Sequence, residues 1–123
     1  MENITIKKLQ DSIFKIDNTP NAIDKYFQKL VEEVGELSRA MRKDIRLKNN
    51  GGIKGTIEEE LNDILYYVIC ISNMYDIDLE KCAILKEELN MQKYNRPSIF
   101  EYNSSFLLFF YCYKAIHKFV ASV

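Results

Sequence analysis

Apolar and acidic residues recur along residues 29–41 with the period of an α-helix. The apolar positions are spaced three and four apart and form a stripe on one side of the predicted helix: Leu30, Val34, Leu37 and Met41. At about 100° per residue, three acidic positions fall on the opposite side of that helix: Glu32, Glu33 and Glu36. The stretch therefore predicts an amphipathic helix with an acidic face, which by itself is typical of a solvated surface.

A second stretch, residues 58–71, changes this interpretation. Residues 64–71 carry no charge, so the predicted helix is apolar around its circumference and should be buried. Glu60 and Asp63 lie one helical turn apart at the start of this run. No Lys or Arg occurs between residues 56 and 73 to pair with them, and a buried carboxylate is costly unless it is paired or binds a metal.

The two acidic helices together predict a shared cation site. Packed helices have axes roughly 8–10 Å apart, so carboxylates that reach from both helices can bind one ion. Mg²⁺ prefers oxygen ligands, keeps several waters and recruits substrate phosphates. We therefore expect a phosphate-handling enzyme in which Mg²⁺, or Mn²⁺ as a substitute, is held by five carboxylates: Glu32, Glu33, Glu36, Glu60 and Asp63.

Helix signals organise the rest of the chain. They predict helices over four stretches: residues 4–16, 20–47, 56–75 and 79–94. Thr19 followed by Pro20 is typical of a helix start, and Thr56 with Glu59 forms a capping box. Asp78 is a good N-cap for the last helix. We expect an all-α fold, an antiparallel helical bundle with a central helical hairpin that carries EExxE and ExxD.

Composition and charge limit the possible functions. The chain has 123 residues and a net charge of −1, which gives no indication of a nucleic-acid partner. We expect a catalytic domain over residues 1–97 and an apolar helical extension over residues 98–123. The apolar run at residues 106–113 is shorter than the roughly 20 residues of a membrane span, so we expect no membrane contact and a tail that packs on the bundle or on another subunit.

The cysteines bear on the cellular compartment. Cys70, Cys82 and Cys112 are odd in number and widely spaced, and none belongs to a CxxC pair. Cys70 and Cys82 occupy apolar helical positions, where we expect buried thiols. The N-terminus lacks the apolar core of a signal peptide. These features predict a cytoplasmic protein.

The acidic motifs resemble those of a known family. EExxE at residues 32–36, within LVEEVGEL, and ExxD at residues 60–63, within EEELNDILYYV, are similar to the motifs of the MazG-like nucleotide pyrophosphohydrolases, all-α nucleoside triphosphate pyrophosphatases. A third segment, IDLEKCAILKEELNMQKY, resembles the closing helix of that family. There Lys86 and Asn90 match a lysine and an asparagine that contact the nucleotide. The resemblance runs from about residue 21 to residue 96.

The resemblance implies an activity and roles for residues. The expected reaction is Mg²⁺-dependent hydrolysis of a nucleoside triphosphate, with a deoxynucleotide favoured, to the monophosphate and pyrophosphate, for example to clean the nucleotide pool. Glu33 is the expected general base, because the family pattern places the other glutamates better as direct metal ligands. Lys86 and Asn90 are expected to bind phosphate or sugar. Related proteins form homodimers or homotetramers, so we expect one of these assemblies.

Other interpretations remain open. Phosphoribosyl-ATP pyrophosphohydrolase activity is a close enzymatic alternative, and the apolar tail would also suit a catalytically silent helical interaction module. A di-iron carboxylate bundle needs Glu-x-x-His pairs, whereas His117 is the only histidine and has no Glu three positions before it. Basic residues late in the second predicted helix suit its dipole, or one of them reaches a phosphate: Arg39, Arg42, Lys43 and Arg46.

Overall fold

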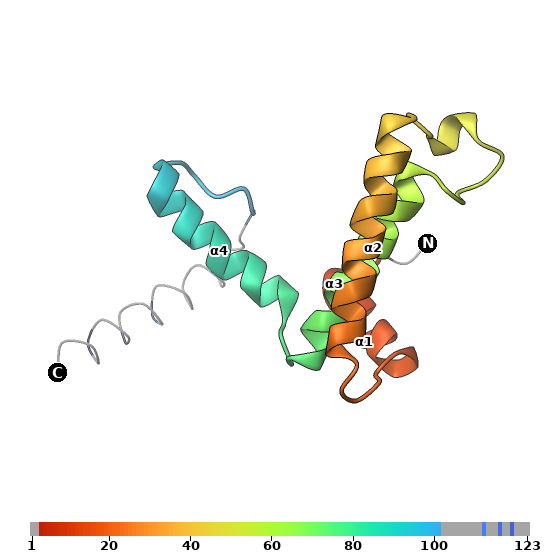
Figure 1. The fold of residues 1–123 in the computed structure, drawn as a ribbon. Helices are drawn as coiled ribbons and strands as arrows, with labels where there is room; N and C mark the ends of the chain where they lie inside the picture. Colours follow the sequence, from red (N-terminus) through yellow and green to blue (C-terminus); the bar gives the residue numbers. More distant parts are fainter. Residues whose placement is uncertain (1–2, 102–111, 113–115, 117–118, 120–123) are drawn as a thin grey trace. The chain divides into compact units, whose positions relative to one another are not determined.

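The protein is built from α-helices. A computed structural model describes residues 3–101 and the single positions 112, 116 and 119. Within them lie four α-helices and one short 3₁₀ helix, and no strand (Figure 1). The elements are α1 (Ile6–Ile16), α2 (Ile23–Arg42), the 3₁₀ helix η1 (Leu47–Asn49), α3 (Ile57–Met74) and α4 (Leu79–Tyr94). The predicted all-α fold is confirmed.

Tertiary contacts divide the chain into two compact units. The first comprises residues 1–83 and the second residues 84–123, so the boundary lies inside α4. The first unit contains α1, α2 and α3 together with the start of α4. The domain boundary expected between residues 97 and 98 stays a prediction.

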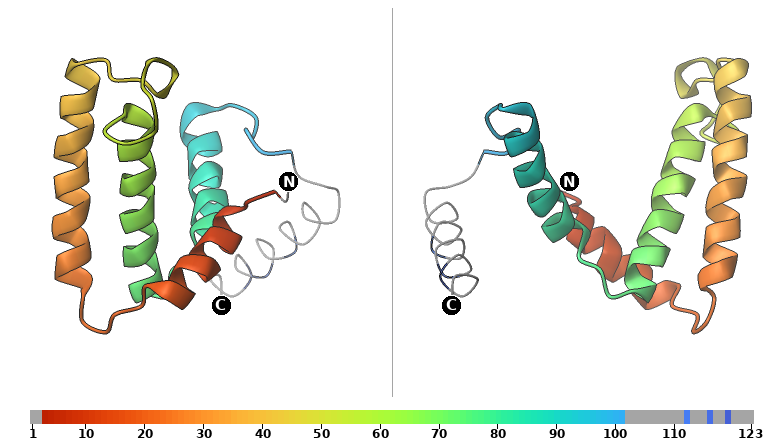
Figure 2. Two further views of the ribbon diagram at one scale, coloured as in Figure 1. Left: turned by 90° about the vertical axis from the view of Figure 1, so that its right-hand side faces the viewer. Right: turned by 60° about the vertical axis from the view of Figure 1, so that its left-hand side comes forward.

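A helical hairpin forms the centre of the first unit. Helices α2 and α3 lie side by side and run in opposite directions (Figure 2). Glu58 closes the connection between them, since its carboxylate accepts a hydrogen bond from the Leu47 amide at 3.0 Å and pairs with Arg46 Nε at 3.2 Å. The hairpin therefore holds EExxE on one arm and ExxD on the other.

Helix α2 is shorter than predicted at both ends. Pro20 does not begin it, because Asn21 has a left-handed backbone with φ of 62° and the Ala22 amide donates to Thr19 O at 3.2 Å. At the other end Asp44 adopts φ of 47°, the left-handed conformation that commonly follows a helix C-terminus. Its amide donates to Met41 O at 3.1 Å. Two left-handed residues thus set the bounds Ile23–Arg42.

The start of α3 follows the predicted cap. The Glu59 amide donates to Thr56 Oγ1 at 3.2 Å, and the Glu59 carboxylate accepts in return from the Gly55 amide. Gly55 has φ of 74°, a conformation that glycine adopts without strain. This reciprocal cap engages Glu59 with the backbone and leaves Glu60, the next residue, free to face α2.

The apolar stripe predicted on α2 does not pack as one surface. Leu30 and Leu37 are half-buried, whereas Val34 is 50% exposed and Met41 is 60% exposed. The residues of α2 that are withdrawn from solvent instead follow a line rotated toward the acidic side: Ile23, Tyr26, Leu30, Glu33, Glu36, Leu37 and Ala40. The face of α2 that packs therefore includes Glu33 and Glu36 and only part of the predicted apolar stripe.

The core lies where α1 crosses the end of the hairpin. Ile13 of α1 packs with Tyr26 of α2 and with Ile69 of α3, which is fully buried. Asp17, in the link between α1 and α2, accepts hydrogen bonds from the Tyr26 hydroxyl at 2.5 Å and the Tyr66 hydroxyl at 2.8 Å. These contacts fix the base of the hairpin and so set the relative positions of α2 and α3.

The second unit contains the C-terminal part of α4. Glu87 is only 2% exposed, and its carboxylate pairs with both terminal nitrogens of Arg96 at 2.6 and 2.8 Å. The Ile99 amide donates to the same carboxylate at 2.9 Å, so Glu87 fastens the segment that follows α4. The expected packing of the 98–123 tail, including the run at residues 106–113, falls almost wholly outside the described residues.

The cysteines agree with the prediction only in part. Cys70 is buried, and burial raises the pKa of its thiol to about 11. Cys82 is exposed, contrary to expectation, because it lies off the side of α4 on which Ala83 and Glu87 are withdrawn from solvent. Cys112 is also exposed, and all three thiols are free. Among the described residues no helix is long and apolar enough to cross a bilayer.

Candidate metal and active site

Three of the five predicted carboxylates converge between α2 and α3. Glu33 of α2 meets Glu60 and Asp63 of α3, and one carboxylate oxygen from each lies within 4.8 Å of the other two. Glu60 is 6% exposed, and the other two are half-buried. Helical spacing explains the arrangement, because Glu60 and Asp63 share one face of α3 and Glu33 lies on the line of α2 that packs against it.

Burial and mutual repulsion act on this group of three, which we call the acidic cluster. Burial raises the pKa of Glu60 above its usual range, and the negative charge of Glu33 raises it further. Burial also raises the pKa of Glu33, with the charge of Asp63 as the next cause and the positive charge of Lys29 opposing both. In the ionised form these side chains therefore repel one another in a partly desolvated space.

The donor set fits a hard divalent cation. It consists of carboxylate oxygens alone, the ligands that suit Mg²⁺ and Mn²⁺. Within the described part of the chain, none of the three carboxylates forms a salt bridge with Lys or Arg. A cation between α2 and α3 would offset the repulsion, and three ligands would leave coordination positions for water or phosphate.

The other two predicted ligands stand apart from the cluster. Glu32 is exposed, and its Oε2 lies 2.7 Å from Lys29 Nζ. Glu36 is half-buried and pairs with Arg39 three residues later. Both glutamates are thus occupied by a cation of their own helix, and their role as metal ligands stays a prediction.

The two predicted substrate residues belong to the second unit. Lys86 is exposed and Asn90 is half-buried on the C-terminal part of α4. Their role in binding the nucleotide, like the choice of Glu33 as general base, stays a prediction.

Two residues near the cluster were not among the predicted metal ligands. Tyr67 follows Asp63 by four positions on the same face of α3, and burial raises the pKa of its hydroxyl, while the positive charge of Lys29 opposes this rise and the negative charge of Glu33 adds to it. Lys29 precedes Glu33 by four positions on α2. Helical spacing from the two motifs was the signal that could have identified both residues.

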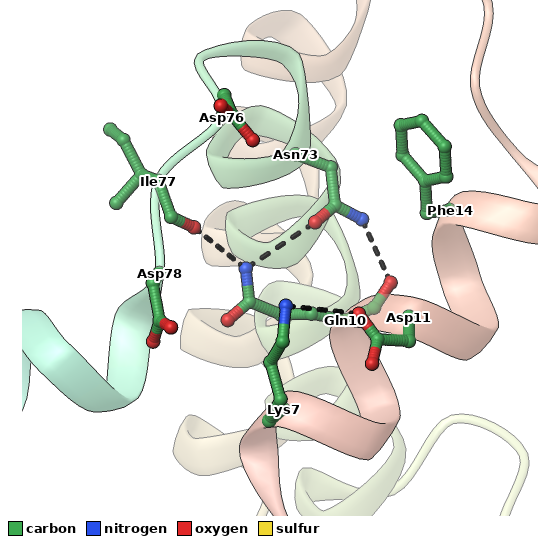
Figure 3. Close-up of a pocket in the computed structure, with 8 residues that line it drawn as sticks. All are labelled: Lys7, Gln10, Asp11, Phe14, Asn73, Asp76, Ile77 and Asp78. Carbon is green, nitrogen blue, oxygen red and sulfur yellow. Dashed lines mark hydrogen bonds and ion pairs between the residues drawn. The ribbon is translucent and has the colours of Figure 1, made fainter.

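A separate pocket of about 360 Å³ lies between α1 and the end of α3 (Figure 3). Three carboxylates line it: Asp11, Asp76 and Asp78. Lys7 Nζ pairs with Asp11 at 3.0 Å. Asn73, also in its wall, is ten positions beyond Asp63 on α3, which corresponds to about 15 Å at the helical rise. The pocket is therefore distinct from the acidic cluster.

Gln10, which lines this pocket, lies at the centre of a hydrogen-bond network. Gln10 is 3% exposed, and its Nε2 donates to Ile77 O at 2.8 Å and Ser72 Oγ at 3.1 Å. Asn73 Nδ2 donates to Gln10 O at 3.0 Å (Figure 3). The Gln10 Oε1 atom accepts from the Leu79 amide at 3.0 Å. Gln10 thus connects α1 to the turn before α4. A polar residue in an amphipathic helix that also contains Lys7, Lys8 and Asp11 gave no indication of this structural role.

Comparison with known proteins identifies the family. The model of the MazG nucleotide pyrophosphohydrolase domain matches residues 21–96, more than half of the chain and the part that contains both acidic motifs. A comparison with curated proteins found no match.

Solved structures agree with the family match. The crystal structure of iMazG from Vibrio DAT 722 is 43% identical, with a TM-score of 0.65, over 76% of this chain and 100% of that one. A second iMazG structure from Vibrio DAT 722 is 41% identical, with a TM-score of 0.64, over 71% and 98%. The Bacillus-conserved MazG protein, a nucleotide pyrophosphohydrolase, is 29% identical with a TM-score of 0.54, over 80% and 98%. The chain belongs to the MazG nucleotide pyrophosphohydrolase family.

Proposed function

We propose that this enzyme hydrolyses a nucleoside triphosphate, with a deoxynucleotide favoured, to the monophosphate and pyrophosphate in the presence of Mg²⁺. The convergence of Glu33, Glu60 and Asp63 carries the proposal, because it joins the EExxE and ExxD motifs in one cluster of hard oxygen ligands. Bound Mg²⁺ would neutralise triphosphate charge and lower the pKa of a coordinated water.

The predicted site residues would take three roles: metal ligand, general base and substrate contact. Glu60 and Asp63 would bind the metal from α3, and Glu32 and Glu36 would complete the ligand set after leaving their cations on α2. Glu33 would accept the proton of the attacking water, and its raised pKa makes it a stronger base than an exposed glutamate. Lys86 and Asn90 would bind phosphate or sugar.

Release of pyrophosphate is the direct test. With Mg²⁺ present, the protein should release pyrophosphate from at least one nucleoside triphosphate, and EDTA should abolish the reaction because the carboxylate cluster depends on a cation. A panel of ribo- and deoxynucleotides that includes phosphoribosyl-ATP, assayed for pyrophosphate, would identify the substrate. Orthophosphate as the first product would contradict the proposal.

We also propose that two copies of the chain associate through the hairpin, as a homodimer or as half of a homotetramer. Several exposed apolar side chains lie on one face of α2: Phe27, Val31, Val34 and Met41. Leu61 and Leu65 of α3 are also exposed, by 52% and 41%. Large exposed apolar patches are typical of protein–protein contacts, and a second copy would bury this one.

Substitution on this face should break the assembly. The double variant Val31→Glu with Val34→Glu should lower the mass in solution to that of one chain, since two carboxylates would then lie in an apolar contact. Light scattering would measure the change. Lys25→Glu, an exposed substitution earlier on α2, is the control. A wild-type monomer, or an assembly that both variants retain, would contradict the proposal.

The net charge and the free cysteines support two further proposals, one on nucleic-acid binding and one on cellular location. We propose no nucleic-acid partner, because the net charge is −1. A cytoplasmic location agrees with three free cysteines.

A further inference from the structure

Lys29 lies one helical turn before Glu33 of the acidic cluster and forms an ion pair with Glu32. It is on α2, four positions before Glu33, so both side chains lie on neighbouring parts of one helical face. Its Nζ is 2.7 Å from Glu32 Oε2, and the Lys29 side chain remains 49% exposed. The ammonium group is therefore paired with Glu32 and in contact with solvent, one turn of α2 before Glu33.

The charge of Lys29 also acts on the residues that surround the cluster. It opposes the rise in the pKa of Glu33 on its own helix and in the pKa of Tyr67 on α3. The four-residue spacing directs Lys29 and Glu33 to the same side of α2, the side on which Glu33 meets Glu60 and Asp63 of α3. None of the residue roles proposed above involves the positive charge of Lys29.

We propose that Lys29 binds a phosphate of the nucleotide, and that its ion pair with Glu32 is exchanged when metal and substrate arrive. Glu32 then turns to the metal, and the freed ammonium group turns to the triphosphate. This inference rests on the proposed function and adds a substrate residue to it.

The exchange is physically reasonable. An ion pair between two exposed side chains adds little stability, so its loss costs little. Lysine suits phosphate as a compact point charge on a flexible stem. The carboxylate and the ammonium group each exchange one partner for another of the same charge, so neither loses a counter-ion.

Arg39 provides a matched control. It pairs with Glu36 three positions before it, as Lys29 pairs with Glu32 three positions after it, and its side chain is 59% exposed. Arg39 follows Glu33 by six positions, about 120° around the helix at 100° per residue, whereas Lys29 precedes Glu33 by four positions, about 40° around it. The two cations therefore carry the same charge but differ in position relative to Glu33.

The experiment measures binding in the full chain by calorimetry. The probes are Mg²⁺ alone, and inorganic pyrophosphate or an α,β-methylene nucleoside triphosphate with saturating Mg²⁺. Lys29→Gln should weaken binding of both phosphate probes about tenfold, the effect of one charge-assisted hydrogen bond, while Arg39→Gln changes it less than about twofold. For Mg²⁺ alone, Lys29→Gln should tighten binding, because it removes a positive charge near the ligands. Lys29→Arg should retain phosphate binding.

The outcomes separate this inference from the proposed function. If Lys29→Gln and Arg39→Gln weaken phosphate binding equally, the effect is one of general charge and the inference is overturned. If Lys29→Gln binds Mg²⁺ alone more weakly than the wild type, Lys29 only positions Glu32, and the inference is also overturned. Unchanged phosphate binding in Lys29→Gln would overturn it while wild-type pyrophosphate release stood. A wild type that neither binds the probes nor releases pyrophosphate would overturn both proposals.

Discussion

Glu33→Gln should lower kcat for pyrophosphate release by about 10²–10⁴-fold, the usual contribution of a general base. The substitution keeps the size of the side chain and removes its ability to accept a proton at neutral pH. Additional Mg²⁺ should not restore the rate, because a missing base is not replaced by metal. Steady-state kinetics over a range of Mg²⁺ concentrations would measure the effect.

Glu60→Gln distinguishes a ligand from a base in the same assay. Loss of a metal ligand should weaken Mg²⁺ binding by at least about 10–100-fold, because loss of a residue that only hydrogen-bonds to a ligand already has an effect of that size. A high Mg²⁺ concentration should therefore restore part of the rate. Glu58→Gln is the control on α3, since Glu58 contacts Arg46 and the Leu47 amide outside the cluster. Recovery of Glu33→Gln by Mg²⁺ would assign Glu33 to the metal instead, and a comparable loss in Glu58→Gln would contradict the assignment of the site.

The sequence predicted the helices well where local signals set their ends. Thr56 and Glu59 form the predicted cap, and α4 has the predicted bounds, because capping depends on residues within one turn. The start of α2 was missed because Asn21 adopts a left-handed backbone after Pro20. An Asn in this conformation is not distinguishable by residue type from an Asn inside a helix.

The candidate site was predicted in part for a related reason. Glu60 and Asp63 were identified by a local conflict, two carboxylates at the start of an apolar helix. For Glu33 the helical period gave the right spacing, and the structure brings it together with Glu60 and Asp63, but α2 also has apolar residues, Val34 and Met41, that stay exposed. Which apolar residues face α3 depends on tertiary packing, and so did the pairing of Glu32 with Lys29.

Asp63→Asn should stabilise the metal-free protein, because the acidic cluster stores repulsion. Its oxygens lie within 4.8 Å of one another. Two unit charges at about 4 Å interact by roughly 4 kcal/mol at an effective dielectric near 20, before relaxation or protonation reduces this value. The variant removes one charge at similar volume. Since about 1 kcal/mol shifts the melting temperature of a small domain by roughly 4–8 °C, a rise of several degrees in EDTA is expected.

The pH dependence should change in the same direction. The pKa values of Glu33 and Glu60 are raised above 4.5 in the folded protein, so the native state binds more protons than the unfolded state just above that pH. The contribution of these two groups to the stability of the metal-free wild type should therefore be fully present below about pH 4.5 and be lost as pH rises through the raised values. Asp63→Asn should flatten this fall, because one of the charges that raises both pKa values is gone.

Mg²⁺ should raise the melting temperature of the wild type more than that of Asp63→Asn. A cation that binds only the folded state stabilises it by mass action, with a gain that increases with metal concentration. The wild type should gain more than Asp63→Asn, since the variant offers one ligand fewer and less repulsion to relieve. A solvated acidic face would behave differently, with a small effect of the substitution and the same general salt response in both proteins. Equal Mg²⁺ dependence of melting at matched ionic strength would therefore remove Asp63 from the metal site, whereas a gain confined largely to the wild type would show that the carboxylates of α2 and α3 act together on one ion.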